Sequence, residues 1–150
     1  MNSSSYVLCI FVAVCFTAVS ADLTCGGRSE VSSIQCNGKE MTKGGLCELK
    51  RGQNASLVLA FVPGMSSKNV TAVCHGVIGG IPIPFNSINH QGCEGLTPSC
   101  PLVPKRPETF KTTIPVKQEY PKLKLIIKWE LQDIASGDDV VCIVIPAQLV

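Results

Sequence analysis

The residues of this chain that could perform covalent chemistry are few, and their spacing does not favour catalysis. The two histidines are His75 and His90, and Cys74 beside His75 suggests a cysteine–histidine nucleophile. Both residues lie in the apolar run 70–78, where neighbours on a strand project to opposite faces and cannot hydrogen-bond to each other without a bulge. A buried thiol beside a histidine on the sheet surface is the simpler interpretation.

Other catalytic and metal-binding patterns do not match either. Asp138 and Asp139 lie in a polar turn, where solvation accounts for both carboxylates. The sequence has no G-x-S-x-G or H-E-x-x-H motif, no phosphate-binding loop and no C-x2-C spacing typical of zinc sites. It therefore predicts no enzyme, no metal site and no cofactor. The formal net charge of +2 is too small to indicate nucleic acid as a partner.

The cysteines indicate an oxidising compartment. Residues 6–19 form an apolar run shorter than the roughly 20 residues that span a bilayer, and small residues precede Asp22, so residues 1–21 are predicted to be a signal peptide. Two of the nine cysteines lie within it, and the remaining seven predict three disulfides and one thiol. Cys36 with Cys47 and Cys93 with Cys100 look like loop staples, in which case Cys25 and Cys142 join the two ends of the domain. Spacing alone leaves other pairings open.

Two glycosylation sequons follow the signal peptide. They are Asn54-Ala55-Ser56 and Asn69-Val70-Thr71. Asn54 shares the parity of the outward-facing side of its predicted strand, and Asn69 follows a Ser-Ser-Lys turn. We therefore predict that Asn54 and Asn69 are exposed and glycosylated.

Alternating apolar residues predict the strands that must position any site. The clearest strand is 123–132, where apolar residues recur at every second position and the opposite face is almost entirely polar. Further strands are predicted at 55–62, 70–78, 110–114 and 140–145, whereas the Gly- and Pro-rich segment 79–85 should break regular pairing. No stretch has a helical period, so the sequence predicts an all-β sandwich.

Lysines gather on the polar face of the clearest strand. Lys122, Lys124 and Lys128 project from it, and Lys117 lies nearby in the sequence. An ordinary solvated face is the simpler interpretation. The alternative is a weakly basic surface that docks on anionic lipid headgroups, worth about 1 kcal/mol per charge.

An aliphatic core leaves room for a binding pocket. The mature part has few aromatic residues, and a sandwich fills a gap of about 10 Å between its sheets with side chains. Such a core can leave space at one end, where Phe85, Val116 and Tyr120 lie in proline-bounded irregular segments that would form its rim. In the alternative interpretation, Phe85 and Trp129 simply fill the core.

A set of short motifs from residue 75 onward is specific enough to indicate a family. They are His75-Gly76, Gly80-Ile81-Pro82-Ile83-Pro84-Phe85, Gly92-Cys93, Cys100-Pro101-Leu102, Pro115-Val116-Lys117-Gln118-Glu119-Tyr120-Pro121, Lys128-Trp129-Glu130-Leu131-Gln132-Asp133, Cys142 and Ile145-Pro146. With these motifs the sequence resembles the Niemann-Pick type C2 proteins, secreted sterol carriers with an MD-2-related lipid-recognition domain. The resemblance covers residues 22–150, which would be that domain.

The resemblance implies an immunoglobulin-like β-sandwich of about seven strands with a lipid tunnel between its sheets. It implies the pairs Cys25–Cys142, Cys36–Cys47 and Cys93–Cys100. It also implies that Phe85, Val116 and Tyr120 surround the tunnel mouth and that Trp129 lines the wall. Cys74 departs from the family, which usually has an aliphatic residue at this position.

The function implied by the resemblance is cholesterol or sterol binding and lipid transport. The carrier would be a secreted or lysosomal monomer that exchanges its sterol with membranes or with a sterol-accepting membrane protein. The alternative is an innate-immunity or chemosensory protein that binds bacterial glycolipids, fatty acids or semiochemicals. Lys117 is the only basic residue next to the predicted rim in sequence, which favours the carrier over a binder of charged headgroups.

Overall fold

The computed structural model describes residues 23–150. The predicted signal peptide, residues 1–21, lies outside the described residues. Among residues 23–150, no helix combines the length and the apolar character that crossing a bilayer requires.

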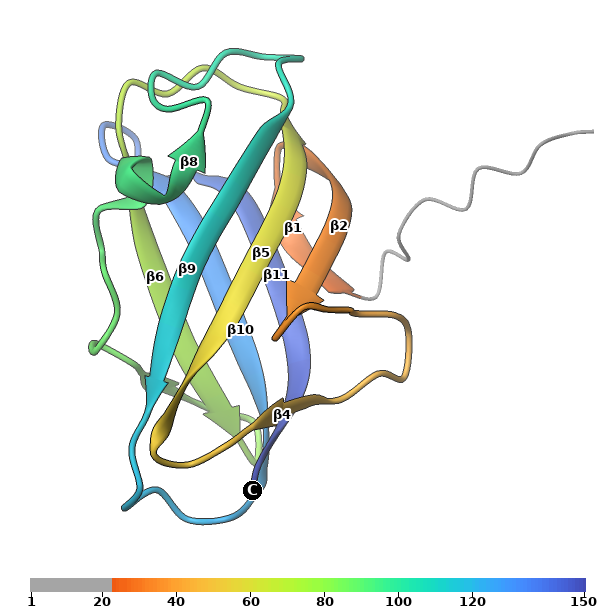
Figure 1. The fold of residues 1–150 in the computed structure, drawn as a ribbon. Helices are drawn as coiled ribbons and strands as arrows, with labels where there is room; N and C mark the ends of the chain where they lie inside the picture. The colour runs from red at the N-terminus through yellow and green to blue at the C-terminus, as the bar shows by residue number, and fades with distance from the viewer. Residues whose placement is uncertain (1–22) are drawn as a thin grey trace, which may run out of the picture.

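Two β-sheets pack face to face and form the body of the protein (Figure 1). One sheet has the order β1-β11-β10-β6-β7, with β4 added in parallel to β11, and the other has the order β3-β2-β5-β9-β8. The bounds of the first sheet are β1 Thr24–Gly27, β4 Cys47–Leu49, β6 Val70–Ile78, β7 Ile81–Pro84, β10 Lys124–Asp133 and β11 Asp139–Leu149. Those of the second are β2 Ser29–Cys36, β3 Lys39–Glu40, β5 Gln53–Pro63, β8 Leu96–Thr97 and β9 Glu108–Val116, and a 3-10 turn, η2 Gly92–Gly95, precedes β8.

This architecture confirms the predicted immunoglobulin-like sandwich. Of the 11 strands in the described chain, β1, β3, β4, β7 and β8 have four residues or fewer and lie at sheet edges or ends. The six longer strands, β2, β5, β6, β9, β10 and β11, form the two layers, close to the number of about seven that the resemblance implies.

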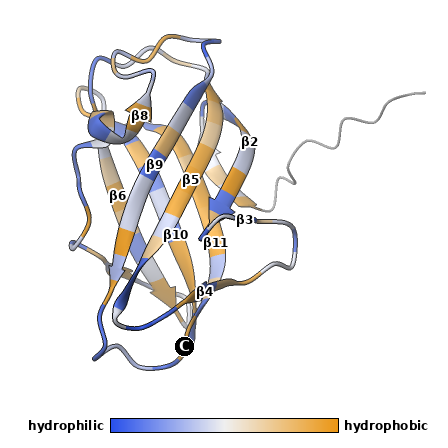
Figure 2. Cartoon of the chain, viewed as in Figure 1, coloured by the Kyte–Doolittle hydropathy of each residue, from blue (hydrophilic) through white to orange (hydrophobic). Residues whose placement is uncertain are grey.

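Strand β10 has the two-sided character that its sequence predicts. Ile127, Trp129 and Leu131 are buried between the sheets, and Lys124 on the other face is exposed. Figure 2 shows the corresponding alternation of apolar and polar bands along the long strands. Glu130 is the exception on the polar face, because it is only 7% exposed between the neighbouring strands β6 and β11.

The segment 79–85 does not break the sheet, contrary to the prediction. Gly79 and Gly80 both have positive φ, at 58° and 82°, and form a two-residue hairpin turn of the kind that glycine favours. Strand β7 then pairs with β6 from Ile81 to Pro84. Proline is tolerated there because β7 is an edge strand, in which alternate N–H groups point away from the sheet and donate to no neighbouring strand.

Strands β5, β9 and β11 run further than predicted, and at one end of the sandwich β5 already begins at Gln53, which pairs with Val116. Strand β9 extends through Pro115 to Val116, and β11 extends to Leu149. Leu149 pairs in parallel with Leu49 of β4, so residues a hundred positions apart lie side by side.

Three disulfides hold the loops and the edge of the sandwich. They join Cys25 to Cys142, Cys36 to Cys47 and Cys93 to Cys100, the pairs that the family resemblance implies. The first links edge strand β1 to β11, and the other two close loops. Cys74 is the remaining cysteine of the described chain and is free.

Both sequon asparagines are exposed in the fold. Asn54 lies at the start of β5, and Asn69 directly precedes β6 at the opposite end of the sandwich. Their exposure is compatible with glycosylation, which stays a prediction.

Candidate functional site

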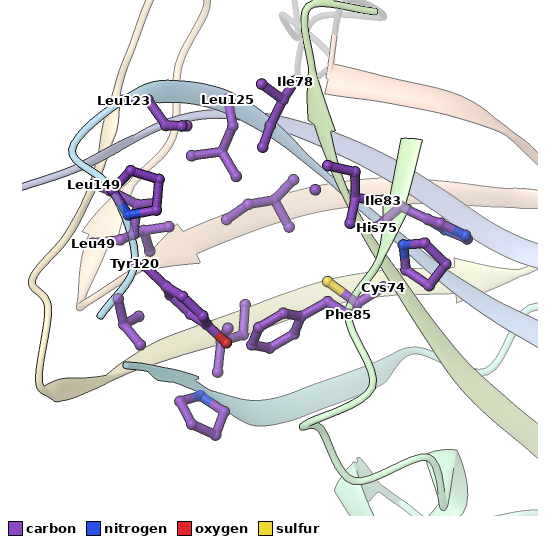
Figure 3. A pocket seen from close by; sticks show the side chains of 17 residues that line it. Leu49, Cys74, His75, Ile78, Ile83, Phe85, Tyr120, Leu123, Leu125 and Leu149 are labelled. Carbon is purple, nitrogen blue, oxygen red and sulfur yellow. The ribbon is translucent and has the colours of Figure 1, made fainter. Parts of the chain in front are cut away.

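A cavity of about 290 Å³ lies between the two sheets at the end where β9 and β11 terminate (Figure 3). The first sheet contributes β4, β6, β7, β10 and β11 to its wall, and the second contributes the end of β9. The 17 lining residues are Leu49, Cys74, His75, Gly76, Ile78, Ile83, Pro84, Phe85, Ile114, Pro115, Val116, Tyr120, Pro121, Leu123, Leu125, Ile127 and Leu149.

The cavity wall is almost entirely hydrocarbon. Of its lining side chains, only those of Cys74, His75 and Tyr120 carry a nitrogen, oxygen or sulfur atom. Burial raises the pKa of the Cys74 thiol to about 12, so this sulfur is a neutral thiol at physiological pH and a poor nucleophile. A wall of this kind suits an apolar ligand, which it holds by shape and burial.

Two aromatic rings meet at the cavity. Phe85 and Tyr120 lie edge to face, with ring centroids 6.2 Å apart and ring planes at 71°. Phe85 comes directly after β7, and its N–H donates to the carbonyl of Cys74 at 2.9 Å. Tyr120 lies in the β9–β10 connection, and both side chains are half-buried (Figure 3).

Val116 ends β9 beside these rings. Its side chain is buried against the cavity, and its carbonyl accepts a hydrogen bond of 2.6 Å from the N–H of Gly52. Phe85, Val116 and Tyr120, which were predicted to form the rim of a pocket, therefore all line one cavity.

Comparison with known proteins identifies the family. A family model described as ML domain matches residues 23–149. NPC intracellular cholesterol transporter 2 of Danio rerio is 40% identical over 104 residues, which cover 69% of this chain and 68% of that protein. The Drosophila melanogaster protein named NPC intracellular cholesterol transporter 2 homolog a is 33% identical over 126 residues, covering 83% and 84% of the two chains.

This chain belongs to the ML-domain family. A solved structure agrees: the Niemann-Pick type C2 protein from Japanese carpenter ant superimposes with a TM-score of 0.74 at 26% sequence identity, covering 85% of this chain and 97% of that one. The resemblance to Niemann-Pick type C2 proteins that the sequence motifs indicate is thereby confirmed.

Trp129 is not among the residues that line the cavity of this ML domain, and its contact with a bound lipid stays a prediction. Its side chain is fully buried and packs against Phe110 of β9, with ring centroids 5.7 Å apart. Leu125 and Ile127 precede it on the same face of β10 and do line the cavity. Trp129 lies deeper along the strand, where the two rings fill the space between the sheets.

Several lining residues of the ML domain were not identified from the sequence as part of a site. They come from strands far apart in the chain, and they are Leu49, Cys74, Ile78, Ile83, Ile114 and Leu149. Apolar alternation marks most of them as inward-facing. It does not reveal that their side chains border a hollow, because that depends on what lies opposite.

Basic residues lie around the cavity end, but not all are available to a ligand or membrane. Lys117, Lys122 and Lys124 are exposed. Lys128 is half-buried, and its Nζ lies 3.6 Å from Oε1 of Glu130, so this lysine is ion-paired within the protein. Arg51, which is distant in sequence, also lies at the cavity mouth, where its Nη1 donates to the main-chain carbonyl of Tyr120.

A carboxyl pair of the ML domain lies on the outer face of β10 and β11. Burial and a hydrogen bond with Glu130 raise the pKa of Asp139 to about 6. Burial alone would raise the pKa of Glu130, but hydrogen bonds with Asp139 and Gln132 and the charge of Lys128 outweigh it and lower that pKa. Sγ of Cys142 and one carboxylate oxygen each of Glu130 and Asp139 lie within 4.8 Å of one another, but this sulfur is in the disulfide with Cys25 and so cannot act as a thiolate ligand.

Proposed function

We propose that this chain is a lipid carrier that binds cholesterol or a related sterol in the cavity and transfers it between membranes or to a membrane acceptor. The observation that carries the proposal is the hydrocarbon-lined cavity between the sheets, with Phe85 and Tyr120 at its mouth. The relatives named as cholesterol transporters support a sterol-binding lipid-transport role. The disulfides are compatible with a secreted protein or one of the lysosomal lumen.

Burial of apolar surface would drive binding. Removing hydrocarbon from water contributes roughly 25 cal/mol per Å², and the wall offers few hydrogen-bonding groups that could compete with it. A sterol would therefore insert its apolar end and leave its hydroxyl near the mouth. No covalent step is needed, and the neutral Cys74 thiol supplies no nucleophile for one.

The cavity must widen to accept such a ligand. Its volume of about 290 Å³ lies at the lower limit of ligand pockets, which occupy roughly 300–1,000 Å³. Phe85 and Tyr120 are only half-buried, so their rings can rotate about their side-chain torsions while the backbone bond from the Phe85 N–H to Cys74 stays in place. We expect these two rings to separate when a sterol binds.

The cavity end would also be the face that meets a membrane. Ile81 and Ile83 of β7 are 66% and 49% exposed, and Ile83 also lines the cavity. Lys122 and Lys124 are exposed on the neighbouring segment. Exposed isoleucines with nearby lysines suit a surface of hydrocarbon and anionic headgroups.

A binding assay with a fluorescent sterol tests the proposal. Val116→Phe adds a ring to the cavity wall and should weaken binding about tenfold or more, because overpacking displaces the ligand. Val103→Phe is the matched control, since Val103 is exposed near the opposite end and its substitution should leave binding unchanged. Normal binding by the Val116 variant would contradict the assignment of the mouth.

The same assay separates sterol from other lipids. Unlabelled sterol, a fatty acid and a bacterial glycolipid are each added as competitors. Displacement by sterol alone is the expected result. If a fatty acid or a glycolipid displaces the probe and unlabelled sterol does not, the result would favour the chemosensory or innate-immunity alternative and overturn sterol as the ligand.

A further inference from the structure

The turn between β4 and β5 contacts the loop that carries Tyr120. We call residues 117–123, between β9 and β10, the gate loop. At its start the N–H of Gly52 donates to the carbonyl of Val116 at 2.6 Å. Further along, Nη1 of Arg51 donates to the carbonyls of Gln118 at 3.4 Å and Tyr120 at 3.3 Å. The Arg51 side chain therefore hydrogen-bonds to two main-chain carbonyls of the gate loop, one before and one after residue 119.

The local backbone brings Arg51 close to the gate loop. Gly52 has a φ of +79°, a conformation that favours glycine, and a Cβ there would lie 2.9 Å from Oε1 of Gln118. The main-chain N–H of Arg51 is fixed separately, by the carbonyl of Val150 at 3.2 Å. The turn is thus anchored to the end of the chain, while the arginine side chain reaches across to the gate loop.

The Arg51 contacts restrain the gate loop without locking it. Both donor–acceptor distances exceed the usual 2.7–3.2 Å of protein hydrogen bonds. The Nε of Arg51 is buried and has no hydrogen-bond partner. Such an arrangement favours the closed loop by a small free energy, as a gate that must also open requires.

We propose that Arg51 is a positioning residue that holds the gate loop over the cavity and thereby sets the rates of lipid uptake and release. That lipid is what passes the gate loop rests on the proposed function, whereas the contact between Arg51 and the loop is observed in the structure. Tyr120, whose carbonyl Arg51 holds, packs its ring against Phe85 at the cavity. Because the contact is made with the loop and not with the ligand, it favours closure of the empty and the loaded protein equally.

Because the Arg51 contact stabilises the closed loop equally in the empty and the loaded protein, its loss should change rates and not affinity. Loss of the contact should raise the uptake rate and the release rate by the same factor and leave the dissociation constant nearly unchanged. A residue that contacted the ligand would instead change the dissociation constant, mainly through release.

The first measurement uses the ligand-free protein and needs no assumption about the lipid. Arg51→Met keeps an apolar stem and removes the donors. Lys50→Met is the matched control, because Lys50 is exposed on the same turn and its side chain does not hydrogen-bond to the described residues of the gate loop. We expect the Tyr120 amide, whose N–H donates to the carbonyl of Lys117 at 3.2 Å, to exchange about tenfold faster in the Arg51 variant. The control should exchange at the wild-type rate.

The second measurement follows the rates of fluorescent-sterol uptake and release in the same variants. In Arg51→Met, the uptake rate and the release rate should each rise by about the same factor as the amide exchange rate. Arg51→Lys keeps the charge but not the planar guanidinium group, so its rates should lie between those of the wild type and those of Arg51→Met. Unchanged exchange in Arg51→Met would overturn the positioning role whatever the sterol does. Faster exchange with unchanged sterol rates would overturn the gating role.

A failure of the proposed function is distinguishable from these results. If exchange accelerates as expected but wild-type protein binds no sterol, Arg51 still positions the loop and the ligand assignment falls. Thermal unfolding of each variant is measured alongside. Should Arg51→Met fail to fold, Arg51→Lys provides the same comparison with a smaller expected change.

Discussion

The two ends of this sandwich are built from the same strands but are packed differently. At the cavity end, β9 and β10 present Ile114, Leu125 and Ile127 to the interior, and a hollow remains between them. Further along the same two strands, Phe110 and Trp129 project inward and pack against each other. We call this second region the filled end.

Polar contacts also differ between the ends. At the filled end, Nη2 of Arg106 donates to the carbonyl of Pro101 at 2.6 Å and to the buried Glu108 carboxylate at 3.0 Å. Asp133 there accepts hydrogen bonds from Ser67 and Ser136, which lower its pKa. The gate loop at the cavity end is held by the longer bonds from Arg51.

The comparison teaches that stability and binding are separated along the length of the strands. The interior of the filled end, where Phe110 packs on Trp129, should contribute more to stability than the cavity end, where a hollow remains. Substitutions at the filled end should therefore lower stability strongly and leave lipid binding intact, whereas substitutions at the cavity end should lower stability less and act mainly on lipid binding.

The strongest test of this separation is Trp129→Ala. Removing a fully buried ring that packs on Phe110 should lower the free energy of unfolding by about 3–5 kcal/mol. Urea unfolding measures the loss. At temperatures where the variant stays folded, its sterol affinity should equal that of the wild type, and a large loss of affinity there would show that the two ends are coupled.

The Arg106–Glu108 pair should give the next largest effect. Arg106→Met leaves the buried Glu108 carboxylate without its ionic partner and should cost about 1.5–3 kcal/mol, the range for a lost hydrogen bond to a charged group. Replacing both residues, as Arg106→Met with Glu108→Gln, removes the stranded charge. The double variant should be more stable than the single one, and equal stabilities in urea unfolding would argue against this cause.

Leu125→Ala tests the cavity end. Leu125 is half-buried and borders the hollow, so its truncation should cost only about 1–2 kcal/mol, less than a fully packed leucine. The enlarged cavity should bind the sterol at least as fast as the wild type. A stability loss as large as that of Trp129→Ala would mean that this end is as tightly packed as the other.

The smallest expected effect is the pH dependence from Asp139. Its folded pKa of about 6 exceeds the unfolded value of about 3.9, so its protonation favours the folded state. This contribution is complete below about pH 4 and is lost as pH rises through about 6. Because the group is partly exposed, solvent screening should reduce it to about 1 kcal/mol or less. The lowered pKa of Glu130 acts in the opposite direction, as stability lost when pH falls.

Asp139→Asn isolates that contribution. The variant should lack the part of the stability decline that the wild type shows between about pH 4 and 6, measured as unfolding midpoints across this range. Asp139 begins β11 at the opposite end from Leu149, so sterol affinity at neutral pH should not change. Identical pH profiles for the two proteins would contradict the raised pKa.

Sequence reasoning identified the strands most reliably where one face is buried. The alternation on β10 is borne out because each inward side chain meets the opposite sheet. It was wrong about residues 79–85, because the prolines at 82 and 84 suggested broken pairing although an edge strand accommodates them. The rim residues Phe85, Val116 and Tyr120 were singled out because they lie in irregular segments and match the family motif, and all three line the cavity.

The amino-acid sequence by itself determined the all-β class and which strand faces point inward, because a side-chain period of two is a local property of extended backbone. Only the tertiary structure decided that Leu125 borders a hollow while Trp129, four residues later, is enclosed. Only it brought Leu49 beside Leu149 and Arg51 to the carbonyl of Tyr120. These outcomes depend on the volume and position of side chains from distant segments, which no local pattern encodes.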